Sequence, residues 1–212
     1  MKSLLIVELA STKVRFLKVN NLQNTQIIAR KHFKSNKNLT KNVDYTEIQK
    51  INGYVKSMLV SRFPGSSKTY IYVLDDLPPL FLNRIKLSYE SEPIAYVSSI
   101  KALGYKLRNK MLKSEINFVF YNNKIYIGYF KDGRFNLKIF IDFNNFKDFQ
   151  GFSANFTEKL LLFDLDTRSS IIKILIDKDF PLKSWNYKFL AKYFKKSEIL
   201  SEIVDFPAYL HF

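Results

Sequence analysis

The stretch from Leu4 to Val19, LLIVELASTKVRFLKV, decides how the sequence is interpreted. Two runs rich in Leu, Ile, Val and Phe flank a polar Ser-Thr turn, a composition typical of a β-hairpin. A fainter copy follows at Leu160–Ile176, LLLFDLDTRSSIIKILI. Each copy has an acidic residue near its turn, a layout that in some folds holds a nucleotide phosphate between two hairpins. Both turns lack the glycines that such a close approach needs, so the sequence predicts a fold more firmly than a chemistry.

Around the first hairpin, the sequence predicts a third strand at Gln26–Lys34, then a helix and a fourth strand. The helix begins with Asp44 and Glu47 in capping-box spacing, continues with apolar residues on one face, and ends near Phe63. The next strand is Thr69–Leu74. A helix of this length carries the chain back across a sheet, so this strand is expected to run parallel to an earlier one.

The middle of the chain begins after the Pro-Pro break at residues 78–79. A strand is expected at Leu80–Ser88, and a helix from Ser91, with Pro93 in its first turn, to Gly104. Three strands follow, joined by Asn122-Asn123 and Asp132-Gly133, pairs typical of tight turns. These strands are Ile116–Tyr121, Lys124–Phe130 and Arg134–Ile141.

The last part of the chain is expected to hold a short helix, a second hairpin and two further short helical segments. The helix is placed at Asn144–Phe156, the hairpin strands at Lys159–Leu165 and Ser170–Asp177, and the last two helical segments at Trp185–Lys195 and Ser197–Asp205. The segments group into residues 1–76, 77–142 and 143–212. The sequence contains no run of 18 apolar residues, so no membrane span is expected within it. A span that follows Phe212 in a longer parent chain is left open.

The composition favours anionic partners and offers no catalytic set. Lys and Arg number 34 against 19 Asp and Glu, a net charge of +15 that suits nucleic acid, an acidic protein surface or anionic lipid. The absence of Cys excludes disulfides, thiolate metal sites and a cysteine nucleophile, and fits the cytoplasm. His32 and His211 have no partner residues at metal-ligand or catalytic spacing. We therefore expect no catalytic residue and no metal site.

Taken together, the element order and the two acidic turns resemble the actin-like assembly proteins. These include PilM of type IV pili, the cytoplasmic domain of the type II secretion protein GspL, its pilus counterpart BfpC, and the division protein FtsA. Val7–Arg15 is similar to the first hairpin of PilM, L-D-I-G-S-S-x-I-K; Tyr70–Leu87 is similar to the stretch that leads into the inserted domain; and Phe163–Ser170 resembles the second phosphate hairpin. The resemblance implies a mixed α/β structure: a reduced actin-like, RNase H-like fold with a mixed sheet and an inserted small α+β subdomain.

The departures from the family pattern imply a degenerate nucleotide site and no cofactor. In the family, an Asp of the first hairpin helps to hold Mg²⁺ and a Gly admits the phosphate, whereas here Glu8 is longer and Ala10 adds a Cβ. Asp166 stands where the second hairpin would have Gly and would repel phosphates. Glu8 and Asp164 are better explained as turn carboxylates that accept backbone N–H groups than as Mg²⁺ ligands. The degenerate positions are Glu8, Ala10, Ser11, Thr12, Asp164, Asp166 and Thr167.

The resemblance implies a non-catalytic scaffold of a type IV pilus or type II secretion assembly platform, at the inner face of the inner membrane. Its expected partners are proteins of that machine, with a secretion ATPase and the anionic membrane as further candidates. One alternative is a nucleic-acid-binding protein that uses aromatic, basic strands, although an ordinary packed sheet explains the aromatics better. A second is an actin-superfamily ATPase. Candidate contacts for an anionic partner are Lys124, Lys131, Arg134 and Lys138.

Overall fold

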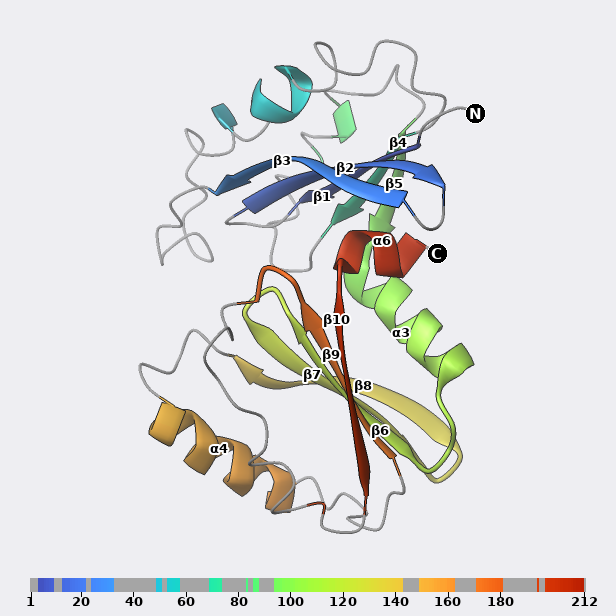
Figure 1. Cartoon of the computed structure of the whole chain (residues 1–212), viewed down its shortest axis with the longest axis vertical. Coiled ribbons are helices and arrows are strands. Elements are labelled where there is room, and N and C mark those ends of the chain that lie inside the picture. The colour runs from blue at the N-terminus through green and yellow to red at the C-terminus, as the bar shows by residue number, and fades with distance from the viewer. Residues whose placement is uncertain are drawn as a thin grey trace. The chain divides into compact units, whose positions relative to one another are not determined.

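The chain is described by a computed structural model and forms two compact units (Figure 1). The first unit contains Met1–Leu103 and Pro207–Phe212, and the second contains Gly104–Phe206. The three-part division expected at residues 76 and 142 stays a prediction. The structure describes residues 4–9, 13–21, 24–32, 49–50, 53–57, 69–73, 83, 86–87, 94–142, 149–162, 171–180, 194 and 197–211.

The first unit contains a five-stranded mixed sheet in the order β3-β2-β1-β4-β5. β1, β2 and β3 are antiparallel, whereas β4 runs parallel to β1 and β5 parallel to β4. The first hairpin and the parallel strand predicted from the sequence are thus confirmed. β1 is the central strand, and residues 5–9 are all buried. The strands are β1 (Leu4–Leu9), β2 (Lys13–Asn21), β3 (Asn24–His32), β4 (Thr69–Val73) and β5 (Ile94–Ser98).

The second unit repeats this topology in a second five-stranded sheet. Its order β8-β7-β6-β9-β10 has antiparallel β6, β7 and β8, followed by β9 parallel to β6 and β10 parallel to β9. The three consecutive strands predicted in the middle of the chain are confirmed. The strands are β6 (Glu115–Tyr121), β7 (Lys124–Lys131), β8 (Arg134–Asp142), β9 (Ile171–Asp177) and β10 (Glu198–Val204).

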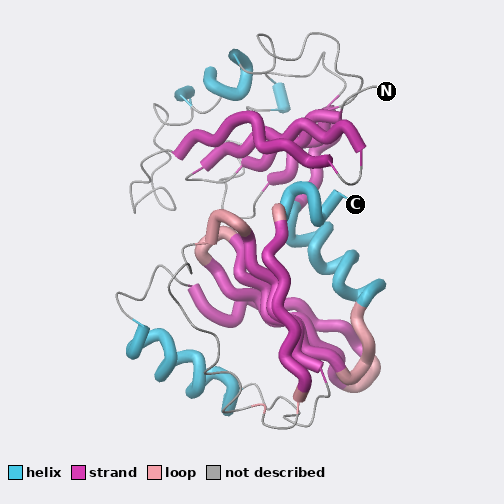
Figure 2. The backbone as a smooth tube through the Cα atoms, viewed as in Figure 1, coloured by secondary structure: helices cyan, strands magenta, loops and turns pink. Residues whose placement is uncertain are grey.

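Two helices cover opposite faces of the second sheet, as Figure 2 shows. α4 (Phe149–Leu162) buries Phe152, Phe156 and Leu160, spaced four residues apart, against one face. On the other face, Leu107 of α3 (Ser99–Lys110) packs closely on Gly128: a Cβ added to this glycine would lie 3.2 Å from Leu107 Cδ1. A third helix, α6 (Phe206–His211), follows β10.

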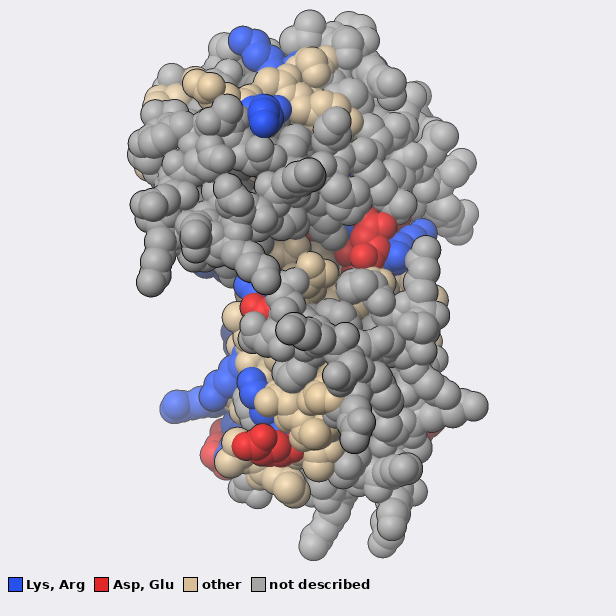
Figure 3. Space-filling view, turned by 90° about the vertical axis from the view of Figure 1, so that its left-hand side faces the viewer, with Lys and Arg blue, Asp and Glu red and all other residues tan. Residues whose placement is uncertain are grey.

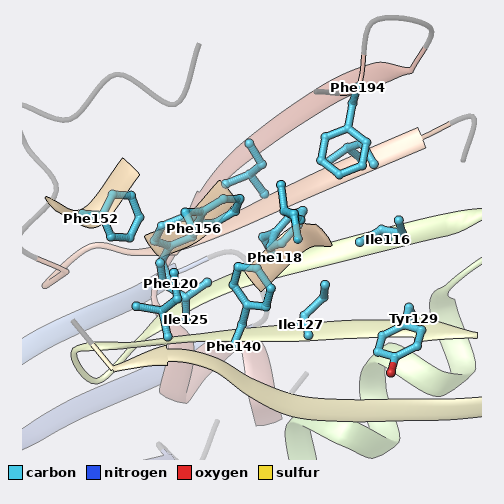
Figure 4. Close-up of a cluster of buried hydrophobic side chains, with 14 of the residues drawn as sticks. Ile116, Phe118, Phe120, Ile125, Ile127, Tyr129, Phe140, Phe152, Phe156 and Phe194 are labelled. Atoms are coloured by element: carbon cyan, nitrogen blue, oxygen red, sulfur yellow. The ribbon is translucent and has the colours of Figure 1, made fainter. Parts of the chain in front are cut away.

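The core under α4 combines aromatic rings with Ile and Leu side chains in about equal numbers (Figure 4). Phe118 of β6 contacts Phe140 and Phe156 with ring centroids 5.6 and 5.3 Å apart. Full burial of such a side chain stabilises the fold by roughly 1.5–3 kcal/mol. Lys159 adds a polar contact at the helix end, because its Nζ donates to the carbonyl of Phe140 at 2.8 Å. This packing fixes the register of β6, β7 and β8 beneath α4.

Three sequence-based assignments are corrected by the structure. Ile94–Ser98 is strand β5, and the helix begins only at Ser99, where Ser98 Oγ accepts a hydrogen bond from the Lys101 N–H at 3.2 Å and so caps it. Lys159–Leu162, expected as strand, is the last turn of α4. Glu198–Val204, expected as helix, is strand β10. In each case pairing or packing with distant residues overrides a local apolar pattern.

The remaining expected elements are described only in part. Residues 49–50 and 53–57 are helical, in agreement with the helix predicted after Asp44, and Tyr54 contacts Phe16 of β2 edge to face. Of the expected strand Leu80–Ser88, Asn83, Lys86 and Leu87 are described, and they are helical. Within the part of the chain that the structure describes, no helix is long and apolar enough to cross a membrane.

Candidate functional site

The first candidate site lies where β1 and β2 approach their turn. Glu8 is the last but one residue of β1, and the strand register places Arg15 of β2 directly opposite. Arg15 Nε donates to Glu8 Oε2, and Arg15 Nη2 donates to Glu8 Oε1 at 2.9 Å. Both side chains are completely buried. The carboxylate is therefore held by a bidentate guanidinium inside the first unit.

This ion pair explains how the sheet tolerates a charge in its central strand. A buried carboxylate without a partner is strongly unfavourable, and an Arg fork is the side chain that compensates it best. The sequence analysis missed Arg15, because its place opposite Glu8 depends on the register between β1 and β2. Ala10, Ser11 and Thr12 lie outside the described residues, so their place in a degenerate site stays a prediction.

Tyr72 lies next to Glu8 on the other side of β1, because β4 pairs with β1 in parallel register. Burial raises the pKa of Tyr72 to about 12, and the nearby Tyr70 adds to this effect. A tyrosine hydroxyl is neutral at physiological pH with its ordinary pKa, and the raised pKa keeps it neutral. A Mg²⁺ ion needs carboxylate oxygens that are not already engaged by a guanidinium. The buried Glu8–Arg15 pair beside a neutral Tyr72 does not fit a Mg²⁺-nucleotide site.

The second candidate position is the matching turn of the second sheet. By topology, β6 and β7 correspond to β1 and β2, so the turn that corresponds to the first hairpin is Asn122-Asn123. Both residues have positive φ, 50° and 55°, and the turn closes directly on the paired Tyr121 and Lys124. Such a two-residue turn leaves no wider loop to surround a phosphate.

The second hairpin expected at residues 159–177 is wrong. Lys159–Leu162 of its first strand are the end of α4, and β9 already has β6 on one side and β10 on the other. Asp164, Asp166 and Thr167 lie outside the described residues, and their assignment stays a prediction. The repeated order of three strands, a helix and a strand was the signal that could have located the true counterpart at Asn122-Asn123.

A third set of polar residues lies at the carboxyl ends of β9 and β10. Asp177 and Asp205 are buried there, and Lys178 Nζ lies 3.6 Å from Asp205 Oδ2. The Lys178 N–H also donates to the Val204 carbonyl at 3.0 Å, which ties the two strand ends together. Among the described residues, no group of three or more His, Asp or Glu is arranged to hold a metal ion.

A basic hollow of about 630 Å³ lies at the β7–β8 turn and the end of α4. In the strand register, Lys131 is opposite Arg134, Tyr129 opposite Asn136, and Ile127 opposite Lys138. Residues opposite each other share a face, so three of the four predicted anion contacts lie together. Figure 3 shows basic side chains beside acidic and uncharged ones on one face of the second unit. The hollow is lined by Tyr129, Lys131, Asp132, Arg134, Asn136, Lys138 and Leu162.

Lys124, the fourth predicted contact, does not line this hollow. It lies at the other end of β7, seven residues or roughly 23 Å along the strand from Lys131. The aromatic platform of the nucleic-acid alternative is not formed either, because all of its rings except the half-buried Phe130 are inside the protein. Phe118, Phe120, Tyr121, Tyr126 and Tyr129 are at most 8% exposed. The packed-sheet interpretation of the aromatic strands is confirmed.

Comparison with known proteins identifies the fold but does not assign the chain to a family. No protein-family model matches the sequence, and no curated protein matches it. A Bacteroides thetaiotaomicron protein, with an actin-like ATPase fold and unknown function, aligns with all of this chain and 96% of its own length, at 10% identity and a TM-score of 0.60.

Two further solved structures align over most of the chain. A PPX-GPPA enzyme from Aquifex aeolicus matches 82% of this chain and 67% of its own, at 14% identity and a TM-score of 0.51. The ethanolamine utilization protein EutJ from Carboxydothermus hydrogenoformans matches 97% and 86%, at 12% identity and a TM-score of 0.50. The protein has a reduced actin-like fold, as the sequence predicted.

Proposed function

We propose that this protein is a non-catalytic scaffold that uses an actin-like fold to bind partner proteins. The observation that supports this is the buried Glu8–Arg15 ion pair at the end of β1. In the family that the hairpin resembles, the acidic residue of this turn helps to hold Mg²⁺. Here that acid is engaged by Arg15, and the turn that matches it in the second sheet is a tight Asn-Asn pair.

Recruiting Glu8 to a metal would carry a large energetic cost. Breaking a buried ion pair by removing one partner from the other costs about 3–5 kcal/mol, because the remaining charge stays buried and uncompensated. That cost is comparable to a large fraction of the stability of a typical domain. The binding energy of a Mg²⁺-nucleotide would have to offset this cost. The intact Glu8–Arg15 pair is therefore favoured over a Glu8 that binds a metal.

In its finer form, the proposal is a component of a type IV pilus or type II secretion assembly platform. The resemblance of Val7–Arg15 to the PilM hairpin supports this assignment, as does the order of elements in the first unit. We propose that the protein acts in the cytoplasm at the inner face of the inner membrane. Its partners there are proteins of the machine, with the secretion ATPase and the anionic membrane surface as further candidates.

The test of the proposal is thermal unfolding with Mg-ATP and with Mg-ADP, against matched samples that contain EDTA. We expect no change in the midpoint. A ligand that binds only the native state, at about a hundred times its Kd, adds roughly 2.7 kcal/mol of stability. A rise of that size with nucleotide, or steady ATP hydrolysis by the pure protein, would contradict the scaffold function and support the ATPase alternative.

The main argument for the ATPase alternative is that one structural neighbour, the PPX-GPPA protein, is an enzyme. The nucleic-acid alternative now depends on basic side chains alone, because the aromatic rings that would stack on bases are buried. A protein-binding role needs neither a free carboxylate at β1 nor exposed rings. It is the function that agrees best with the described residues.

A further inference from the structure

We propose that β8 and the basic hollow beside it bind an acidic peptide segment of a partner protein as an added strand. This inference depends on the proposed scaffold function and names the chemistry of the partner. The peptide backbone would pair with the outer edge of β8. Its carboxylate side chains would enter the hollow lined by Lys131, Arg134 and Lys138.

The charge of the hollow selects an anionic ligand. Three cationic side chains line it and one carboxylate, Asp132, is present; all four are exposed. Within the described residues, no carboxylate forms an ion pair with Arg134 or Lys138. Arg134 offers a planar fork suited to a carboxylate. Asn136 is a neutral residue between the two cations of β8, and its Nδ2, which carries two N–H groups, donates one hydrogen bond to the Arg134 carbonyl at 3.1 Å. The hollow therefore presents an array of donors that favours acidic side chains.

The spacing of these donors favours an extended chain. Arg134, Asn136 and Lys138 alternate along β8, so they recur on one face at intervals of roughly 6.8 Å. A neighbouring strand has the same period, and its alternate residues would lie beside these side chains. Acids at every second position of a peptide match this pattern, whereas acids grouped in a block would place half of their side chains on the opposite face.

The edge of β8 can accept such a strand. In the second sheet, as far as the chain is described, β8 has β7 as its one neighbour. The two-residue turn Asp132-Gly133, with φ of 51° and 72°, makes Lys131 and Arg134 the hydrogen-bonded pair that closes the hairpin. Alternation then directs the backbone groups of Phe135 and Leu137 away from β7. Outward backbone groups supply affinity in strand addition, and side-chain sites at alternate positions supply specificity.

Two other anionic ligands fit these features less well. Single-stranded nucleic acid binds through exposed aromatic faces beside cations, but Tyr129, the ring at the hollow, is 8% exposed. A free phosphate or polyphosphate would use the cations without needing the regular two-residue spacing or the strand edge. A peptide is the ligand that uses the cations, their spacing and the edge together.

The test is fluorescence anisotropy with two short labelled peptides of identical composition. In one peptide Glu alternates with Thr, and in the other the Glu residues form one block. We expect the alternating peptide to bind at least about tenfold tighter than the block peptide, a difference of about 1.4 kcal/mol. Equal binding of the two peptides, or no binding at low salt, would overturn the inference.

Three variants locate the site. The triple variant K131Q/R134Q/K138Q should weaken binding of the alternating peptide by about tenfold or more. The variant K56Q/K101Q/K113Q is the matched control, because it removes three exposed charges elsewhere and should change binding by less than about threefold. Ile139 is a 54% exposed residue of β8, and I139P should weaken binding by removing an edge N–H at a position that tolerates Pro. All three variants should have the same melting temperature as the wild type.

Competition separates the ligand classes and the two proposals. Unlabelled single-stranded DNA or tripolyphosphate that displaced the peptide at lower concentration than the peptide itself would overturn the inference in favour of that ligand. An equal loss of peptide affinity in the triple variant and in its control would also overturn the inference, because binding would then depend only on net charge. Nucleotide binding in the melting experiment would refute the scaffold function by a separate readout, in which β8 takes no part.

Discussion

The two sheets share one topology but fill the same central position with different chemistry. In each, three antiparallel strands are followed by two parallel ones. We align β1 and β6 by the last residue of each strand that pairs with its parallel neighbour. In this alignment, Glu8 of β1 corresponds to Val119 of β6. Around Glu8 lie Arg15 and Tyr72; around Val119 lie Tyr126 and Leu175, all of them buried.

This difference shows that the topology itself does not require a charged pair at its centre. The second sheet is held at that position by uncharged side chains, and buried ion pairs elsewhere can often be replaced by apolar residues with no loss of stability. The charge in the first sheet must instead be explained by what each partner would do alone. Glu8 without Arg15, or Arg15 without Glu8, would be an uncompensated buried charge.

The largest expected effect comes from breaking the pair. Arg15→Ala should lower the free energy of unfolding by about 3–5 kcal/mol, because it leaves the Glu8 carboxylate buried without its guanidinium. The double variant Glu8→Val with Arg15→Tyr copies the second sheet and should lose much less. Urea unfolding of the single and double variants measures this, with Val119→Ala as a control for simple loss of packing at the corresponding position.

If the double variant were as unstable as Arg15→Ala, the correspondence between the two sheets would fail. If Arg15→Ala were nearly neutral, the pair would have to be much more solvated than its burial indicates. Either result would also weaken the main argument for a non-catalytic first unit.

A smaller effect should separate the two units by pH. Lys106 of α3 lies in the second unit, and burial lowers its pKa to about 8, with Lys110 adding to the shift and Glu202 opposing it. Between pH 8 and its ordinary value of 10.5, the unfolded chain holds a proton that the folded chain has released. Stability should therefore rise with pH across that window, by about 1–2 kcal/mol for a partly solvated side chain.

In the first unit the sign is opposite and the window is higher. The pKa of Tyr72 is raised from 10.0 to about 12, so the folded state keeps its proton longer and stability should fall between these values. Urea unfolding across alkaline pH measures both trends. Lys106→Met should remove the rise and keep the fall, whereas Tyr72→Phe should do the reverse. A profile that neither substitution changes would assign the pH dependence to other groups.

The smallest expected effect concerns the turns of the second sheet. Gly133 has φ of 72°, so Gly133→Ala forces a Cβ into the left-handed region and should cost about 1 kcal/mol. Asn122→Gly, in the β6–β7 turn at φ of 50°, is the matched control and should change stability little, since Asn tolerates this region. Thermal unfolding measures both. Equal effects of the two substitutions would mean that backbone strain does not decide these turns.

Local patterns predicted the hairpins of this fold well. β1 and β2 pair as predicted, and the Asn122-Asn123 and Asp132-Gly133 pairs each join strands that are neighbours in sequence, for which local turn chemistry is sufficient. The reduced actin-like fold could be predicted because the order of elements in the first half survives in the sequence. Lys131, Arg134 and Lys138 could be found because they lie on adjacent hairpin strands.

What the sequence could not supply was pairing between distant segments. β10 has Ile199 and Ile203 four residues apart, a helical spacing, yet it forms a strand because β9 offers a parallel edge. Lys159–Leu162 has an apolar, Leu-rich sequence that suggested a strand. It is helical because Phe156 and Phe152, about one and two turns earlier, pack in the core and extend α4 to this point. Arg15 was missed because its role appears only when β1 and β2 are paired in register.

The parallel pairing of β6 with β9 has a consequence during synthesis of the protein. β6 ends at Tyr121, and β9 begins at Ile171. At about 5–20 residues per second, the ribosome takes roughly 3–10 s to deliver the partner of that edge. Until then β6, with the sequence EINFVFY rich in β-forming and aromatic residues, lacks its parallel partner strand on the nascent chain. Self-association during translation is thus a risk set by the topology.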